Sequence, residues 1–253
     1  MVIDISGDKK REWYESAIPI ARVERAKLLP DNEVISNPFQ LLEKKGFFIL
    51  KFPSKDDNLS GFHIRKSGID CIYINSAQTL GRQYFSVWHE YYHAVTGEGS
   101  SLSFHGEREL DEIEFKAECF AGCLLMPEEL VKEYLKNKRI TNLKYIRYTE
   151  IIAMQNYFKV SFQAIIKRLI QIFPEFENDL KKRYSLSKKE RYSELIKLTE
   201  ECHGDVRLIT KTNDVYLSKQ FFDDMEANFI HQRISPEKMK SLLVLLECLE
   251  NES

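Results

Sequence analysis

The pentapeptide at residues 89–93, His-Glu-Tyr-Tyr-His, constrains the folding of this 253-residue chain more than any other feature. Residues four apart share one face of a helix, so the pattern predicts a helix on which His89 and His93 can hold one metal ion. Glu90 lies about 100° further round the axis, where its carboxylate can hold a water beside that metal and act as a general base. A pair of satisfied histidines at the edge of a core is the alternative interpretation.

The residues around the pentapeptide support a helix independently. Apolar side chains recur at helical spacing and predict one face turned toward a core, with the two histidines on its border. They are Tyr84, Trp88, Tyr91, Tyr92 and Val95. We therefore expect a helix from about Thr79 to Gly97.

A second helix follows at residues 111–126 and is stopped by Pro127. A catalytic zinc takes three protein ligands and keeps one position open, so a third ligand is needed. Glu114 and Glu118 are one turn apart on this helix, and both can face the first helix when the apolar sides pack. Ala117, Ala121 and Gly122 are small enough to allow a close approach of the two helices.

The fold class predicted from the whole chain is α+β and mostly helical. Only 10 Gly and 7 Pro occur, which means few turns per residue. Three apolar or alternating runs at 47–52, 61–65 and 71–75 predict a small antiparallel sheet packed on the zincin-like helix pair. Before it we expect a helix over 8–28, kinked or divided at Pro19, and a short helix from Asn37-Pro38 to Gly46.

Charge and cysteine content limit the protein's surroundings. The net charge is −2, so no chain-wide positive field attracts nucleic acid or an anionic membrane. The five cysteines contain no CxxC pair, which favours a reducing cytoplasm. No signal-peptide region and no apolar run of about 20 residues is evident, and we expect a soluble cytoplasmic protein. The basic run at 181–191 is interpreted as a solvated face or linker, with a partner contact as the alternative.

Taken together, these motifs resemble the ImmA/IrrE-type zinc metallopeptidases. That family has an Arg-x-x-Phe lead into HExxH and then a helix of the form ExxANxFAxxLLMP. The lead corresponds to Arg82 and Phe85 and the HExxH to residues 89–93. The second helix corresponds to Glu114, Ala117, Phe120, Ala121, Leu124, Leu125, Met126 and Pro127. The resemblance covers roughly residues 31–172.

The resemblance implies a zinc endopeptidase with His89, His93 and Glu114 as metal ligands and Glu90 as the catalytic residue. Glu118 stands where the family has Asn or Asp, and we expect it to support a zinc-bound imidazole. His105 and Tyr92 are candidates for stabilising the oxyanion. The implied substrate is a helix-turn-helix transcriptional repressor of a mobile element or stress response, encoded nearby.

The chain also departs from the family pattern. Trp88 precedes the motif where a small residue is common, and Tyr91-Tyr92 replace Leu-Gly inside it. This aromatic bulk could narrow the cleft or move the partner helix. Residues 1–172 are predicted to form the peptidase domain, with a core at 31–172, and 173–253 a helical C-terminal extension of unassigned role.

Two other functions remain open. One is a zinc-containing regulator or binding protein without proteolysis. The other is a DNA-binding regulator using residues 148–170, which mimic a helix-turn-helix, although only Gln163, Lys167 and Arg168 suit a DNA-reading helix. Direct nucleic-acid binding is the less favoured of the two, contact with a membrane is not expected, and the oligomeric state is not predicted.

Overall fold

The computed structural model describes residues 8–29, 33–98, 103–104 and 112–251. Its described parts form a five-stranded sheet in the order β4-β2-β3-β1-β5, with helices packed mainly on one side. The strands are β1 (Phe48–Phe52), β2 (Leu59–Lys66), β3 (Ile69–Asn75), β4 (Ser103–Phe104) and β5 (Tyr216–Leu217). The α+β, mostly helical class predicted from the sequence is confirmed.

The predicted sheet was wrong in one respect, because it is mixed rather than antiparallel. β2 and β3 form an antiparallel hairpin, but β1 pairs with β3 in parallel, with Phe48 opposite Cys71 and Phe52 opposite Asn75. The segment that joins β1 to β2 is long enough to cross the end of β3, so β3 can lie between these two strands in the sheet. Alternating hydrophobicity reports which face of a strand is buried, not the direction of its neighbour.

The short helix predicted to begin at Asn37-Pro38 is confirmed. Asn37 accepts a hydrogen bond from the Gln40 backbone N–H and caps α2 (Pro38–Glu43), which begins with the expected proline. Between β2 and β3, Ser67 and Gly68 have φ values of 53° and 82°. Two positive φ values in succession are typical of the tight turns that join twisted hairpin strands.

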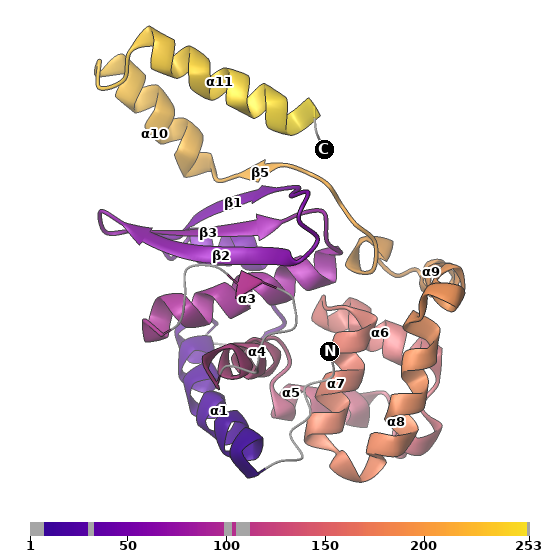
Figure 1. The fold of residues 1–253 in the computed structure, drawn as a ribbon. Coiled ribbons are helices and arrows are strands. Elements are labelled where there is room, and N and C mark those ends of the chain that lie inside the picture. Colours follow the sequence, from indigo (N-terminus) through magenta and orange to yellow (C-terminus); the bar gives the residue numbers. More distant parts are fainter. Residues whose placement is uncertain (1–7, 30–32, 99–102, 105–111, 252–253) are drawn as a thin grey trace.

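The helix pair predicted around the motif lies beneath the sheet. In Figure 1, α3 (Leu80–Thr96) runs along one sheet face, with α4 (Glu112–Leu125) on the far side of α3 and α1 (Asp8–Leu28) against α4. Pro19 lies inside α1 without dividing it, contrary to one of the two expectations. The core between these layers contains Trp88, Tyr92 and Phe120, each at most 1% exposed.

A group of shorter helices packs beside this core and continues into the C-terminal region. It comprises α5 (Glu128–Asn137), α6 (Tyr148–Phe158), α7 (Phe162–Ile172), α8 (Glu177–Arg183) and α9 (Tyr192–Glu201), with short 3-10 turns at Leu143–Tyr145, Pro174–Phe176, Tyr184–Ser187, Lys189–Arg191 and Val206–Leu208. The basic run at 181–191 is a surface segment here, with Lys182 paired to Asp179 at 2.8 Å and Arg191 to Glu194 at 2.7 Å.

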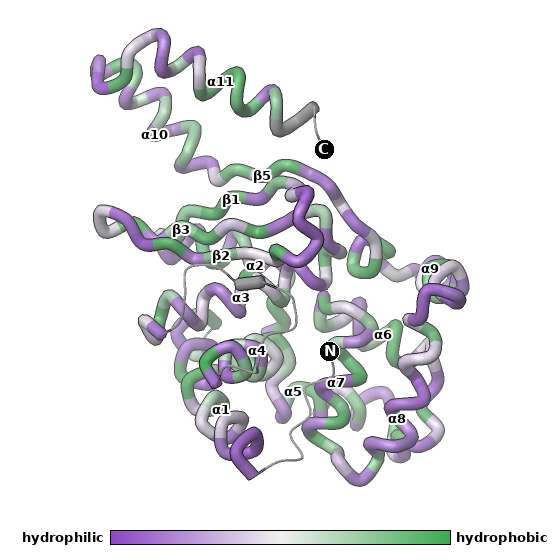
Figure 2. The backbone as a smooth tube through the Cα atoms, in the orientation of Figure 1, coloured by the Kyte–Doolittle hydropathy of each residue, from purple (hydrophilic) through white to green (hydrophobic). Residues whose placement is uncertain are grey.

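The C-terminal part of the chain returns to the edge of the sheet. β5 adds to β1 in antiparallel orientation, a strand that the sequence did not predict. Beyond it, α10 (Lys219–Ile230) and α11 (Pro236–Asn251) form a hairpin above the sheet, away from α3 (Figure 1). Hydrophobic and hydrophilic residues alternate along both helices (Figure 2), and α10 has no buried residue. No helix in the described part of the chain has the length and apolar content needed to cross a membrane.

Candidate metal centre

Helix α3 presents the HExxH motif on its last two turns. Thr79 caps its N-terminus by accepting from the Arg82 backbone N–H at 3.3 Å. Gly97 ends it in the left-handed conformation, with φ 68°, and donates to the carbonyl of His93 at 3.0 Å. The motif is therefore held in regular helix up to its last histidine, as the sequence predicted.

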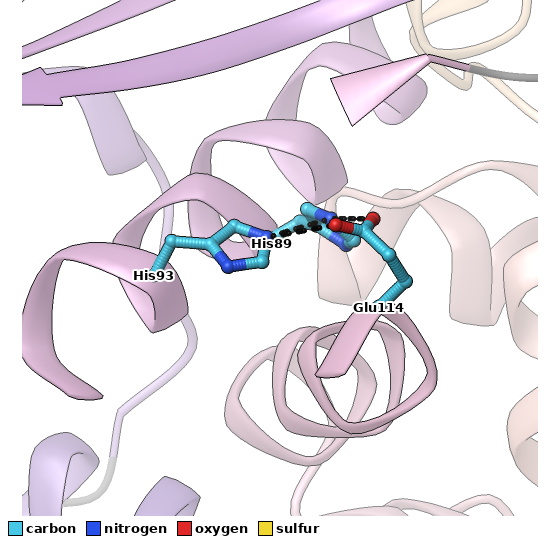
Figure 3. A group of neighbouring side chains, drawn as sticks. All are labelled: His89, His93 and Glu114. Atoms are coloured by element: carbon cyan, nitrogen blue, oxygen red, sulfur yellow. Dashed lines mark hydrogen bonds and ion pairs between the residues drawn. The ribbon is translucent and has the colours of Figure 1, made fainter. Parts of the chain in front are cut away.

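Three donor atoms converge between α3 and α4. The Nε2 atoms of His89 and His93 lie 3.3 Å apart, and the Glu114 carboxylate lies 3.1 Å from the first and 3.5 Å from the second. All three side chains point into one space between the helices (Figure 3). Their ligand atoms lie within 4.8 Å of one another, so this group could hold a metal ion. Both histidines are buried, at 8% and 4% exposed.

The orientation of His93 is set by a backbone group. Its Nδ1 lies 2.8 Å from the carbonyl oxygen of Glu98, which can only accept, so Nδ1 carries the proton. The Nε2 lone pair then faces His89 and Glu114, the arrangement a metal-binding imidazole requires. Sequence reasoning missed this contact because any residue type supplies a carbonyl at that place.

Burial and charge act in opposite directions on the two imidazoles. Burial disfavours the charged form of His89, but the hydrogen bond to Glu114 and the charge of Glu90 outweigh it, and its pKa is raised. Burial and the neighbouring His89 lower the pKa of His93. Glu114 therefore favours the charged form of His89 more than that of His93, and binding of a metal dication to these nitrogens would require both imidazoles to be neutral.

Glu90 lies beside the donor group and is 1% exposed. Strand β2 passes directly over it at Gly61. A Cβ atom at Gly61 would meet the Tyr73 carbonyl oxygen at 2.7 Å and the Glu90 Cγ at 3.4 Å. The absence of a side chain at Gly61 therefore lets the sheet close over the carboxylate. This is a second contributor that the sequence did not identify, since a glycine inside a strand has no distinctive spacing.

The unusual aromatic residues of the motif face the core rather than the donor group. Tyr91 donates to the buried Glu24 carboxylate of α1 at 2.8 Å and packs edge-on against Trp88, with ring centroids 5.5 Å apart. Tyr92 donates to the Glu98 carboxylate at 2.9 Å. The aromatic bulk thus fills space between α3, α1 and α4, and the Tyr92 hydroxyl is already engaged by a carboxylate.

The remaining candidates are distributed around the centre. Glu118 lies one turn beyond Glu114 on α4, half-buried, where its charge acts on His89, Arg82 and Lys167, and its expected support of a metal-bound imidazole stays a prediction. His105 lies outside the described residues. Gly122 has open space where a Cβ would be, so close approach of the helices rests on the fully buried Ala117 and Ala121.

The helix-turn-helix-like segment is packed into the protein. Ile165, Ile166 and Leu169 of α7 are at most 1% exposed. Arg168 is 3% exposed and donates to the Met126 carbonyl at 2.7 Å and to the Tyr14 hydroxyl at 2.8 Å. The Arg168 guanidinium thus binds a backbone carbonyl directly after the C-terminal end of α4, and in this buried position it is not accessible to DNA.

Comparison with known families matches residues 42–170, about half of the chain, to the IrrE N-terminal-like domain, a peptidase family designated M78. The chain belongs to this family. Membership supports a metallopeptidase-type function, and the matched segment contains α3, α4 and all three donors of the candidate metal centre. No curated protein matches the chain. The resemblance seen in the sequence is thereby confirmed.

Proposed function

We propose that this protein is a zinc-dependent endopeptidase that cuts a regulatory protein at a specific site. The observation that carries the proposal is the convergence of two imidazole nitrogens and one carboxylate beside the buried Glu90. Two histidines and a glutamate are a known ligand set of catalytic zinc in peptidases. The Glu98 carbonyl accepts a hydrogen bond from His93 Nδ1–H and so orients the ring, as a second partner generally does for metal-binding histidines.

The donor distances fit zinc. With Zn–N and Zn–O bonds of about 2.0–2.1 Å, two donors of a tetrahedral site lie about 3.3–3.4 Å apart. The two imidazole nitrogens are 3.3 Å apart, one Glu114 oxygen lies 3.1 Å from His89, and the other Glu114 oxygen lies 3.5 Å from His93. The histidine pair thus has the tetrahedral spacing, and the carboxylate lies beside both nitrogens.

A zinc ion held there would polarise a water molecule and the carbonyl of the scissile peptide. Glu90 accepts a proton from that water while the water oxygen bonds to the carbonyl carbon. Glu90 then passes the proton to the leaving amine as the C–N bond breaks. The products are a carboxylate and a free amine. Burial of Glu90 under β2 keeps its carboxylate out of bulk water, and its charge acts on the neighbouring His89.

The proposed substrate is a helix-turn-helix repressor encoded near this chain's gene, with the protease acting in the cytoplasm. This rests on the family to which the chain belongs and on a near-neutral surface, with a net charge of −2, that suits a protein substrate better than DNA. Incubating the zinc-loaded protein with the neighbouring repressor should yield two fragments, and an intact repressor would refute this assignment.

Glu90→Gln tests the peptidase activity. It removes the base but none of the three donors, so we expect one zinc per chain by elemental analysis and a loss of cleavage of about 10³-fold or more. His89→Ala is the matched variant that should lose zinc and cleavage together. Unchanged cleavage in Glu90→Gln would refute the mechanism. Full biological function without cleavage would favour a non-proteolytic zinc regulator instead.

A further inference from the structure

A small cavity lies at the N-terminal end of α3, at the opposite end of the helix from Gly97. Its volume is about 230 Å³, smaller than the about 300–1,000 Å³ of sites for drug-sized ligands. It suits one side chain or a small anion. Thr79, Arg82, Phe85, Ser161, Lys167 and Tyr192 are among the residues that line it.

The lining of this cavity contains two cationic side chains. Arg82 and Lys167 line it, and no carboxylate does so among the described residues. The carboxylates of Glu118 and Glu90 lie near Arg82 and favour its charged form, so Lys167 is the cation left for a ligand. Lys167 is half-buried and forms no ion pair with any described carboxylate within 4.0 Å. Burial lowers the pKa of Lys167, and the charge of Glu118 opposes that shift only in part. An anion beside Lys167 would therefore be stabilised.

The backbone around the cavity adds to this preference. Thr79 and Ser161 are the N-caps of α3 and α7, so both helices begin at the cavity wall. Helix N-termini favour negative charge, here in addition to two cationic side chains.

The cavity lies in line with the metal centre. Arg82 precedes His89 by seven residues, which is two helical turns, so both lie on nearly the same face of α3 about 10 Å apart along the axis. Phe85 lies between them, one turn before His89, and the Arg82 guanidinium is 5.7 Å from its ring. An extended peptide covers this distance with about three residues.

The region after residue 172 completes the cavity. Ser187, Tyr192, Leu195 and Ile209 form the wall facing Arg82 and Lys167. The Tyr192 hydroxyl donates to the Ile209 carbonyl, which ties two parts of this wall together. The C-terminal region thus supplies one side of a site whose cations come from the peptidase domain.

We propose that this cavity binds the acidic side chain of a substrate residue about three positions from the scissile bond. The proposal rests on the proposed peptidase function and gives it a substrate class: polypeptides with Asp or Glu at that distance from the cut. Lys167 is the specificity-determining residue, Arg82 lies in the same lining, and the C-terminal region forms one wall of the pocket.

The test separates binding from cleavage. The full-length, zinc-loaded Glu90→Gln protein is used to select peptides from a random synthetic library, and the bound peptides are sequenced. We expect enrichment of Asp and Glu at one position, lost with Lys167→Gln and kept with Lys136→Gln, an exposed helical lysine. For a selected peptide, changing its Glu to Gln should weaken binding about tenfold in the Lys136→Gln background and not at all with Lys167→Gln.

Three results would overturn the proposal: no acidic enrichment, enrichment that survives Lys167→Gln, or competition by millimolar free glutamate or phosphate as strong as by the peptide. The last result would assign the cavity to a soluble anion. Cleavage of the same library by the wild-type protein is a separate measurement. Its absence would refute the peptidase function while the binding selection still decides the pocket.

Discussion

At Gly81, α3 packs against the backbone of two other segments without room for a side chain. A Cβ atom there would lie 2.5 Å from the Ser161 nitrogen, 2.7 Å from the Leu208 oxygen and 2.8 Å from the Val160 carbonyl carbon. All three are backbone atoms, so no side-chain rotation can relieve the contacts. Ordinary contact begins near 3.4 Å, and Gly81→Ala therefore forces separations of up to about 0.9 Å.

The expected cost is at the upper end of the range for overpacking, about 3 kcal/mol. For a chain of this size, that lowers the melting temperature by about 6–12 °C. The clash lies where α3 packs against the α6–α7 turn and residue 208, beside the cavity that contains Lys167. The variant should therefore also weaken Lys167-dependent peptide binding. Zinc content should remain at one per chain, since all donors lie toward the other end of α3.

Gly122→Ala is the matched control. Gly122 lies in α4, and apart from its chain neighbours and the backbone of its own helix no atom lies within 4 Å of a Cβ position, so alanine there should stabilise the helix by up to about 1 kcal/mol. Both variants are compared with wild type by calorimetry and far-ultraviolet circular dichroism. If Gly81→Ala melts within 1–2 °C (about the measurement error) of wild type, the close packing at this junction is refuted.

Two further predictions concern stability. Chelation of zinc should lower the melting temperature, because a ligand at about 1,000 times its Kd adds about 4 kcal/mol, and His89→Ala should show no such shift. Arg168→Met should destabilise by about 2–5 kcal/mol, because it leaves the buried acceptors at Met126 and Tyr14 without a donor. Denaturant titration measures this cost, and Lys136→Met, an exposed change of the same kind, should stay within about 0.5 kcal/mol of wild type.

The features that the sequence predicted well are local ones. His89 and His93 meet because helical geometry alone brings residues four apart together. Helical spacing left both Glu114 and Glu118 as possible third ligands, and the resemblance to the family selected Glu114. The capping residues Thr79 and Asn37 each accept a hydrogen bond from the backbone N–H three residues later, so the local sequence is sufficient to predict them.

The features that it missed depend on contacts between distant segments. The parallel pairing of β1 with β3 is not encoded in either strand's alternation. β5 spans two residues and has no periodicity to detect. The Glu98 carbonyl that orients His93, and the cavity around Arg82 and Lys167, combine backbone and side chains whose proximity only the tertiary fold determines.

The region after residue 172 divides into two parts by its contacts. Up to β5 it is attached to the peptidase domain: Asn213 donates to the Ser76 carbonyl at 2.9 Å, and Asp214 pairs with the buried Lys51 of β1 at 2.7 Å. Burial lowers the pKa of Lys51, so losing this partner would leave a poorly solvated cation in the sheet.

Beyond β5 the contacts are few. Phe221 at the start of α10 meets Phe48 of β1, with ring centroids 5.9 Å apart, but Phe222, Phe229 and Leu245 are 44%, 40% and 55% exposed. The first part therefore shapes the region around α3, since it lines the cavity beside Arg82 and packs against the N-terminal end of α3. No described residue of the α10–α11 hairpin lines that cavity, and a variant that affects peptide selection should map before residue 218 rather than after it.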